Sequence, residues 1–130
     1  MWGGSYGGRM TSLAMARASE FWVAGADYAG VHDMRNYYSR FLKTPEERET
    51  AFQSSAIAHV DKWKAPVLLM VGDADNLTPD TVNLAAALRK EGVAVDQLMI
   101  PDEVHFLLKH KSWHVIFQAT KDYLDKHLKP

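Results

Sequence analysis

An uninterrupted run of five apolar residues constrains the fold of this chain more than any other feature. The run occupies residues 67–71, between Pro66 and Gly72. It contains no alternating polar position, so both faces of the strand that it predicts must be covered. Strands of this kind belong to parallel sheets, which carry helices on their two faces. The run therefore favours an α/β architecture.

The rest of the chain alternates between helical and strand patterns. Two helix starts, at Thr44-Pro45 and Thr78-Pro79, place a capping threonine before a proline at the first helical position. Ser112 is the expected N-cap of the last helix. We expect helices at residues 10–17, 32–42, 45–55, 79–91 and 113–128, and strands at residues 21–26, 67–71 and 93–100. This order predicts about three parallel strands flanked by helices.

Composition excludes several function classes. The chain has 130 residues, a formal net charge of −1 and no cysteine. Its Lys and Arg residues are scattered, so we expect no nucleic-acid partner and no membrane partner. Without cysteine there is no disulfide, no thiolate nucleophile and no cysteine-ligated metal cluster. No apolar run approaches the ~18 residues that span a bilayer, and the first residues lack the regions of a signal peptide.

The segment Gly3-Gly4-Ser5-Tyr6-Gly7 matches the pattern G-x-S-x-G. In this pattern a sharp strand-to-helix turn holds the serine in a strained conformation, and small flanking residues let the helix pack closely on the backbone. The hydroxyl of Ser5 would then be exposed at the top of the sheet, where the amide of Tyr6 would stabilise an oxyanion. A glycine-rich flexible tail is the alternative interpretation.

A nucleophilic serine needs a base and an acid that orients the base. Asp73 and Asp75 follow the strand at residues 67–71, and His105 follows the strand at residues 93–100. Taken singly, these are ordinary turn and loop residues. Their order along the chain and their place after parallel strands favour a Ser-Asp-His triad. We select Asp75 as the acid, because Asp73 is better placed to bond the turn backbone.

Five other histidines compete for the role of base. His110 and His114 are four residues apart, like a helical metal pair, but an N-cap at Ser112 would leave His110 outside the helix. No third ligand is evident, so we expect no metal site and keep His110 as the second choice for the base. The remaining histidines lie away from strand ends and are His32, His59 and His127.

Four segments of the chain form a distinctive ordered set. They are residues 2–11 (WGGSYGGRMT), 31–33 (VHD), 66–75 (PVLLMVGDAD) and 101–106 (PDEVHF). The set resembles the C-terminal catalytic region of the prolyl oligopeptidase family of serine peptidases, which includes dipeptidyl peptidases and acylaminoacyl peptidases. The resemblance implies an α/β-hydrolase fold that hydrolyses peptide bonds through an acyl-enzyme and needs no cofactor.

The same resemblance assigns roles to single residues. It implies Ser5 as nucleophile, Asp75 as the acid of the triad and His105 as the base. Family members commonly have glycine on both sides of the histidine, whereas Val104 and Phe106 flank it here. This departure would narrow the histidine loop without removing the base.

Further assignments from the resemblance concern substrate binding. The N–H of Tyr6 is implied as one oxyanion donor, and the aromatic segment around Tyr37 and Tyr38 as the border of the pocket for the residue before the scissile bond. An aromatic pair on a helix is also typical of side chains that pack in the hydrophobic core.

The position of Ser5 sets the expected domain organisation. In an α/β-hydrolase the serine follows the fifth strand, yet only four residues precede Ser5. We therefore expect residues 1–130 to be a partial catalytic domain, truncated at the N-terminus, of a serine peptidase that acts on short peptides. Two alternatives stay open: an esterase or acyl hydrolase of the same fold, or an incomplete fragment that self-associates or pairs with its missing N-terminal half through an exposed sheet edge. The sequence does not determine the compartment.

Overall fold

A four-stranded parallel sheet organises the chain in the computed structural model, which describes residues 1–128. The strands are β1 (Trp2–Gly4), β2 (Gly25–Tyr28), β3 (Val67–Gly72) and β4 (Val95–Ile100), and they lie side by side in this order. All three neighbouring pairs are parallel. Their carboxyl ends therefore lie along one edge, where the loops after the strands meet.

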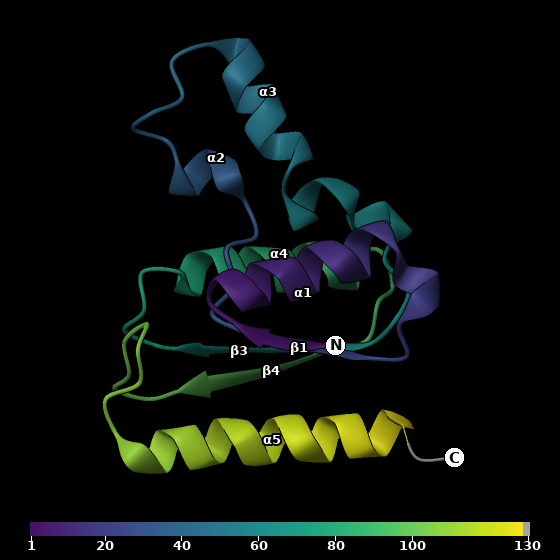
Figure 1. The fold of residues 1–130 in the computed structure, drawn as a ribbon, viewed down its shortest axis with the longest axis vertical. Helices are drawn as coiled ribbons and strands as arrows, with labels where there is room; N and C mark the ends of the chain where they lie inside the picture. Colours follow the sequence, from purple (N-terminus) through teal and green to yellow (C-terminus); the bar gives the residue numbers. More distant parts are fainter. Residues whose placement is uncertain (129–130) are drawn as a thin grey trace.

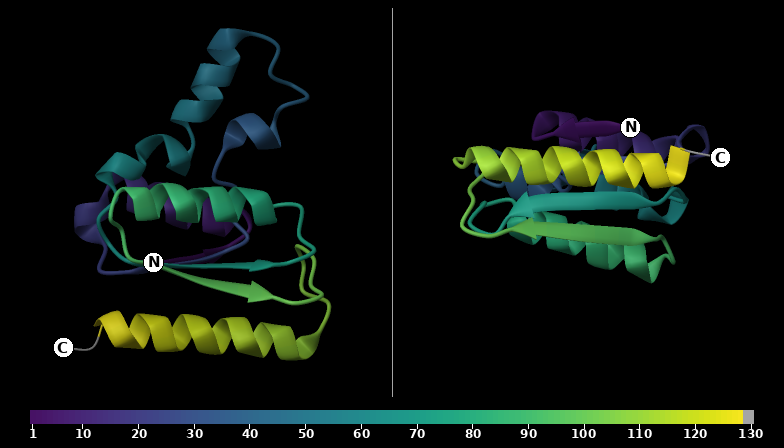
Figure 2. Two further views of the ribbon diagram at one scale, coloured as in Figure 1. Left: turned by 180° about the vertical axis from the view of Figure 1, so that it is seen from behind. Right: turned by 90° about the horizontal axis from the view of Figure 1, so that it is seen from below.

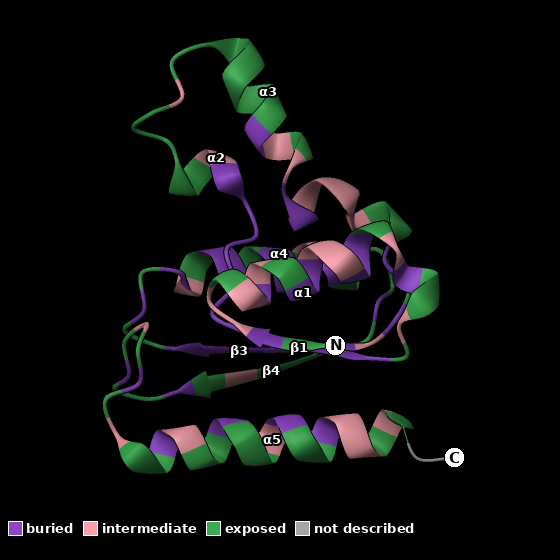
Figure 3. Ribbon diagram, in the orientation of Figure 1, coloured by how far each residue is buried: buried purple, intermediate pink, exposed green. Residues whose placement is uncertain are grey.

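Helices cover both faces of this sheet (Figures 1 and 2). α1 (Tyr6–Arg17) and α4 (Thr78–Lys90) lie side by side on one face, and α5 (His110–Leu128) lies on the other. A short arm of α2 (Met34–Tyr37) and α3 (Pro45–Gln53) rises beyond α1 and is mostly exposed (Figure 3). Two 3₁₀ helices, Ser19–Phe21 and Ala56–Lys62, complete the connections.

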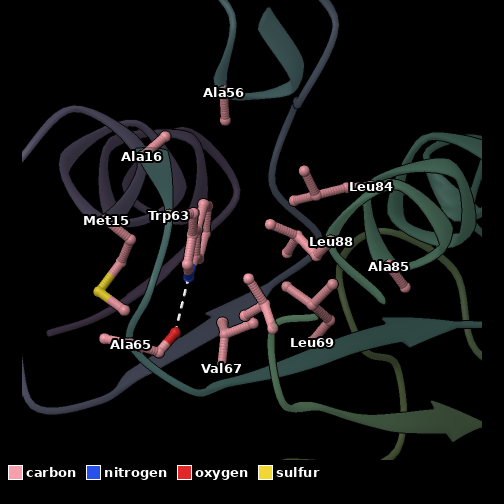
Figure 4. Packing of buried hydrophobic residues seen from close by; sticks show 11 residues of the cluster. Met15, Ala16, Ala56, Trp63, Ala65, Val67, Leu69, Leu84, Ala85 and Leu88 are labelled. Atoms are coloured by element: carbon pink, nitrogen blue, oxygen red, sulfur yellow. Dashed lines mark hydrogen bonds between the residues drawn. The ribbon is translucent and has the colours of Figure 1, made fainter. Parts of the chain in front are cut away.

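The inner strand β3 explains why the sheet needs helices on both faces. Every residue of β3 is buried. Val67 and Leu69 point into a cluster with α1, α4 and Trp63, whose indole N–H donates to the Ala65 carbonyl at 2.7 Å (Figure 4). The alternate side chains, such as Leu68, pack into a second cluster under α5. The prediction of a parallel strand covered on both faces is confirmed.

The first half of the chain departs from the predicted elements. Residues 2–4 add a strand that the sequence pattern did not reveal, and the first helix starts at Tyr6. The strand expected at residues 21–26 begins only at Gly25, because its neighbour β3 starts opposite Gly25. The helix expected at residues 32–42 is the single turn α2. It begins only after Asp33, which is extended and caps the turn through its side chain, and the residues after Tyr37 are mostly exposed.

Two of the predicted caps are wrong, while the third is confirmed. Thr44 caps α3 with the reciprocal hydrogen bonds of a capping box. Thr78 instead lies inside α4, and its hydroxyl donates to the Gly72 carbonyl at 2.6 Å. Ser112 lies inside α5, and its hydroxyl donates to the Glu103 carboxylate at 2.6 Å. Both hydroxyls therefore tie a helix to a strand end or loop instead of capping a helix.

Candidate active site

Ser5 forms the sharp link between β1 and α1. Its backbone has φ 55° and ψ −117°, a positive φ that is strained for a residue with a side chain. The Ser5 amide donates to the Tyr28 carbonyl at 2.8 Å, and the Arg9 amide donates to the Ser5 carbonyl at 3.0 Å. These bonds hold the strained turn at the carboxyl end of the sheet. A flexible tail is excluded, because residues 2–17 form β1, this turn and α1.

The glycines around Ser5 allow this close approach. A Cβ atom on Gly3 would collide with the backbone carbonyl of Gly7. A Cβ atom on Gly8 would lie 2.9 Å from the Tyr28 carbonyl oxygen and 3.0 Å from the Gly30 Cα. The prediction that small residues let α1 pack closely on the strands is confirmed.

Ser5, His105 and Asp75 form a continuous chain of hydrogen bonds. The Ser5 Oγ lies 2.7 Å from His105 Nε2, and His105 Nδ1 lies 2.9 Å from Asp75 Oδ2. The Asp75 side chain is fully buried, and its Oδ1 accepts a bond from the Leu77 amide at 2.8 Å. An ionised carboxylate only accepts hydrogen bonds, so Nδ1 must carry the proton and Nε2 is free to accept from Ser5.

The competing residues lie elsewhere. Asp73 is exposed, and its backbone amide bonds the Ile100 carbonyl. His110 is exposed in the first turn of α5, with its ring 4.6 Å from that of His114. Within residues 1–128, neither Asp73 nor His110 forms a hydrogen bond with Ser5, so the structure brings together the preferred residues and not the alternatives.

The loop that carries His105 is pinned to α5 by a buried carboxylate. Glu103 is fully buried and accepts hydrogen bonds from the amides of Leu108 and Lys109 and from the hydroxyl of Ser112. These donors, the Ser112 hydroxyl above all, hold the pKa of Glu103 below its usual value, against the opposing effect of burial. The histidine loop is thereby fixed on both sides of His105 without flanking glycines.

Tyr28 connects the serine and the histidine, and the sequence analysis missed it. Its hydroxyl donates to the His105 carbonyl at 2.7 Å, while its backbone carbonyl accepts from the Ser5 amide. The ring is buried edge-on against Trp113. Burial raises the pKa of Tyr28 above its ordinary value, so the hydroxyl stays a donor. Tyr28 lies two residues beyond the strand that the sequence predicts at residues 21–26, so no sequence pattern singled it out.

A cavity of about 110 Å³ opens beside the Ser5 hydroxyl. The side chains of Tyr37 and Tyr38 line it, with ring centroids 5.0 Å apart. Both rings are partly exposed, so they border a cavity and do not form a core. The cavity is lined by Ser5, Tyr6, Arg9, Val31, Met34, Tyr37, Tyr38, Leu77 and His105.

A second cavity of about 390 Å³ adjoins the first and shares Val31, Tyr37 and Leu77 with it. It is more polar and includes the carboxylate of Asp80. Burial raises the pKa of Asp80, and hydrogen bonds from the His32 and Asp33 amides oppose this rise.

A third cavity of about 240 Å³ lies on the other side of Ser5 and is almost entirely apolar. Trp2 and Phe106 line it, and both are substantially exposed. Within residues 1–128, no cluster of three or more His, Asp or Glu side chains could hold a metal ion. No helix in the same described range has the length and apolar character needed to cross a membrane.

A parallel sheet with a serine at a strained strand-to-helix turn, and with an aspartate and a histidine after later strands, defines an α/β-hydrolase fold. The chain belongs to the prolyl oligopeptidase family, whose family model matches residues 1–130. The resemblance in the sequence is thereby confirmed.

Individual relatives agree with this assignment. The chain is 30% identical over 134 residues to a probable dipeptidyl-aminopeptidase B of Neurospora crassa, and 29% identical over 135 residues to the inactive dipeptidyl peptidase 10 of Mus musculus. The match covers 95% of this chain in both cases, but only 14% and 17% of those relatives. A solved acylaminoacyl peptidase in complex with Z-Gly-Gly-Phe-chloromethyl ketone has the same fold, with a TM-score of 0.86, 20% identity, and coverage of 98% of this chain and 23% of that one.

Proposed function

We propose that the complete gene product is a serine peptidase that hydrolyses short peptides through an acyl-enzyme on Ser5. One family relative is named inactive, so membership alone does not carry this proposal. The observation that carries it is the hydrogen-bond chain from Ser5 Oγ to His105 at 2.7 Å and from His105 to Asp75 at 2.9 Å. These distances suit proton transfer from serine to histidine.

The reaction follows from the protonation states of the three residues. His105 Nε2 takes the Ser5 proton as the oxygen attacks the substrate carbonyl carbon, and the imidazolium then gives that proton to the leaving amine. Asp75 keeps the Nδ1 proton in place and stabilises the imidazolium. Water, deprotonated by the same Nε2, then attacks the acyl-enzyme, and the Ser5 oxygen leaves with the proton.

The oxyanion of the tetrahedral intermediate requires hydrogen-bond donors. The Ser5 amide already donates to the Tyr28 carbonyl, so it does not serve this purpose. Tyr6 is the first residue of α1, and its N–H has no acceptor within the helix. We assign the Tyr6 amide as one oxyanion donor, which the positive end of the helix dipole would assist.

The substrate side chain before the scissile bond would occupy the cavity bordered by Tyr37 and Tyr38. This cavity includes both Ser5 and His105 in its wall, so a side chain bound there brings its own carbonyl carbon to the serine. No cofactor enters the proposed reaction.

The edge of β1 is the proposed contact with the rest of the polypeptide. β1 pairs with β2 on one side, and among the described residues no strand pairs with its other side. The apolar cavity of about 240 Å³ lies beside this edge, and Trp2 is 47% exposed. We propose that a strand from sequence outside these 130 residues covers it. Sedimentation of the 130-residue chain alone should then show self-association; a stable monomer that turns over peptides would contradict this.

Hydrolysis of matched substrates tests the activity and separates it from the esterase alternative. The complete gene product should cleave a chromogenic peptide anilide, and Ser5→Ala should abolish cleavage. Ser39→Ala is the control, because Ser39 is exposed and lines none of the cavities around Ser5. Cleavage of esters with no cleavage of any anilide would favour the esterase.

A further inference from the structure

Arg9 places a positive charge in the wall of the cavity beside Ser5. Its side chain is half-buried. Nε donates to the Met34 sulfur at 3.1 Å, and the two terminal nitrogens reach the Ser54 carbonyl at 3.3 Å and the Tyr6 hydroxyl at 3.5 Å. A thioether is a weak acceptor, and the other two bonds are long. The guanidinium therefore lacks a strong acceptor among these contacts.

The carboxylates around this cavity already have partners of their own. Asp75 is bonded to the histidine, Asp33 forms an ion pair with Arg35 at 2.7 Å, and Asp80 accepts two backbone amides. No carboxylate of residues 1–128 forms an ion pair with Arg9. Apart from the Tyr6 ring, whose centroid lies 5.4 Å from the guanidinium carbon, the positive charge of Arg9 is thus left for a group that enters the cavity.

We infer that this cavity selects an anionic side chain, so that the preferred substrates carry glutamate or aspartate before the scissile bond. The inference rests on the proposed peptidase function. A guanidinium and a carboxylate form charge-assisted, often bidentate hydrogen bonds that a neutral amide does not match. The contacts of Arg9 with α2 and with the end of α3 fix the guanidinium in the wall, so little ordering is needed when the carboxylate binds.

The test compares two isosteric substrates in the complete gene product. Peptide anilides with Glu or with Gln before the scissile bond differ in charge and hardly in shape. We expect kcat/KM to favour Glu by about tenfold or more. Arg9→Met should bring the Glu/Gln ratio close to one, and Arg9→Lys should keep part of the preference, since it retains a point charge without the planar fork.

Arg17→Met is the matched control. Arg17 lies on the same helix and also donates to a carbonyl near the end of α3, that of Gln53 at 2.7 Å, but it does not line the cavity. The Glu/Gln ratio should stay at its wild-type value in this variant. Equal cleavage of Glu and Gln substrates by the wild-type enzyme, or a ratio that Arg9→Met leaves unchanged, would overturn the inference while the peptidase function stands. Failure to cleave any peptide would overturn both.

Discussion

Replacing Asp75 by Asn tests how the buried carboxylate governs the histidine. Asp75 makes two bonds, from Oδ1 to the Leu77 amide at 2.8 Å and from Oδ2 to His105 Nδ1 at 2.9 Å. Asparagine can keep the first bond with its carbonyl oxygen. Its NH₂ group then faces Nδ1 and favours the tautomer with the proton on Nε2. A protonated Nε2 cannot accept the proton of Ser5, so the variant would fold but lose its general base.

The size of the loss follows from this change of tautomer. The equivalent substitution in a serine protease of known mechanism lowers kcat by about 10⁴, which corresponds to about 5.4 kcal/mol of transition-state stabilisation. The cost in stability should be at most about 2 kcal/mol, because the Leu77 bond survives and the group stays hydrogen-bonded. We expect a kcat loss of this order on a peptide anilide, with a melting temperature close to that of the wild type.

Asp73→Asn is the matched control for this experiment. Asp73 is two residues away in the same loop, but its side chain is exposed. Its kcat should stay within about twofold of the wild-type value, because exposed substitutions away from a site have small effects. The reasoning would be refuted if Asp75→Asn kept kcat within tenfold of the wild type, or if Asp73→Asn caused the larger loss.

Three further predictions concern the parts that support the site. Tyr28→Phe removes the bond to the His105 carbonyl. It should lower the free energy of unfolding by about 1 to 3 kcal/mol and raise the activation free energy for kcat by a similar amount, with KM nearly unchanged. Steady-state kinetics and denaturant unfolding check this, and a change in KM alone would argue against it. Gly8→Ala places a Cβ 2.9 Å from the Tyr28 carbonyl oxygen and should destabilise the chain by about 1 to 3 kcal/mol in thermal unfolding; an unchanged melting temperature would contradict the close packing. The depressed pKa of Glu103 means that its stabilising effect is present above its unfolded pKa of about 4.3 and is lost as pH falls through the lower folded value. The difference in the free energy of unfolding between the wild type and Glu103→Gln should therefore be large at pH 7 and shrink below pH ~4. A difference that grows in acid would contradict a lowered pKa of Glu103.

The sequence predicted the fold best where local pattern and tertiary burial agree. β3 was evident because a strand that packs on both faces must be apolar throughout. The capping box at Thr44 was evident because its hydrogen bonds are all local. β1 was missed because three residues, two of them glycine, give no periodicity, and only pairing with the distant β2 makes them a strand.

The residues of the candidate site also divide into those that the sequence pattern reveals and those that only the folded structure reveals. The order of Ser5, Asp75 and His105 along the chain could be matched to strand ends, so the sequence identified residues that the structure brings within hydrogen-bond distance. Tyr28 could not be found in this way. Its role depends on a bond to a backbone carbonyl 77 residues away, and such a bond leaves no pattern in side-chain types. Arg9 was part of a recognised motif, but only its missing acidic partner in the folded structure draws attention to its charge.

Covalent labelling of Ser5 tests the central claim most directly. A fluorophosphonate reacts with a serine hydroxyl only when a base activates it and an oxyanion site accepts the developing charge. Treatment of the complete gene product, followed by proteolysis and mass spectrometry, should place one phosphonyl group on the peptide that contains Ser5. The adduct should be absent in Ser5→Ala and strongly reduced in a His105→Ala variant. A phosphonyl group on another serine, or labelling that persists without Ser5, would contradict the account.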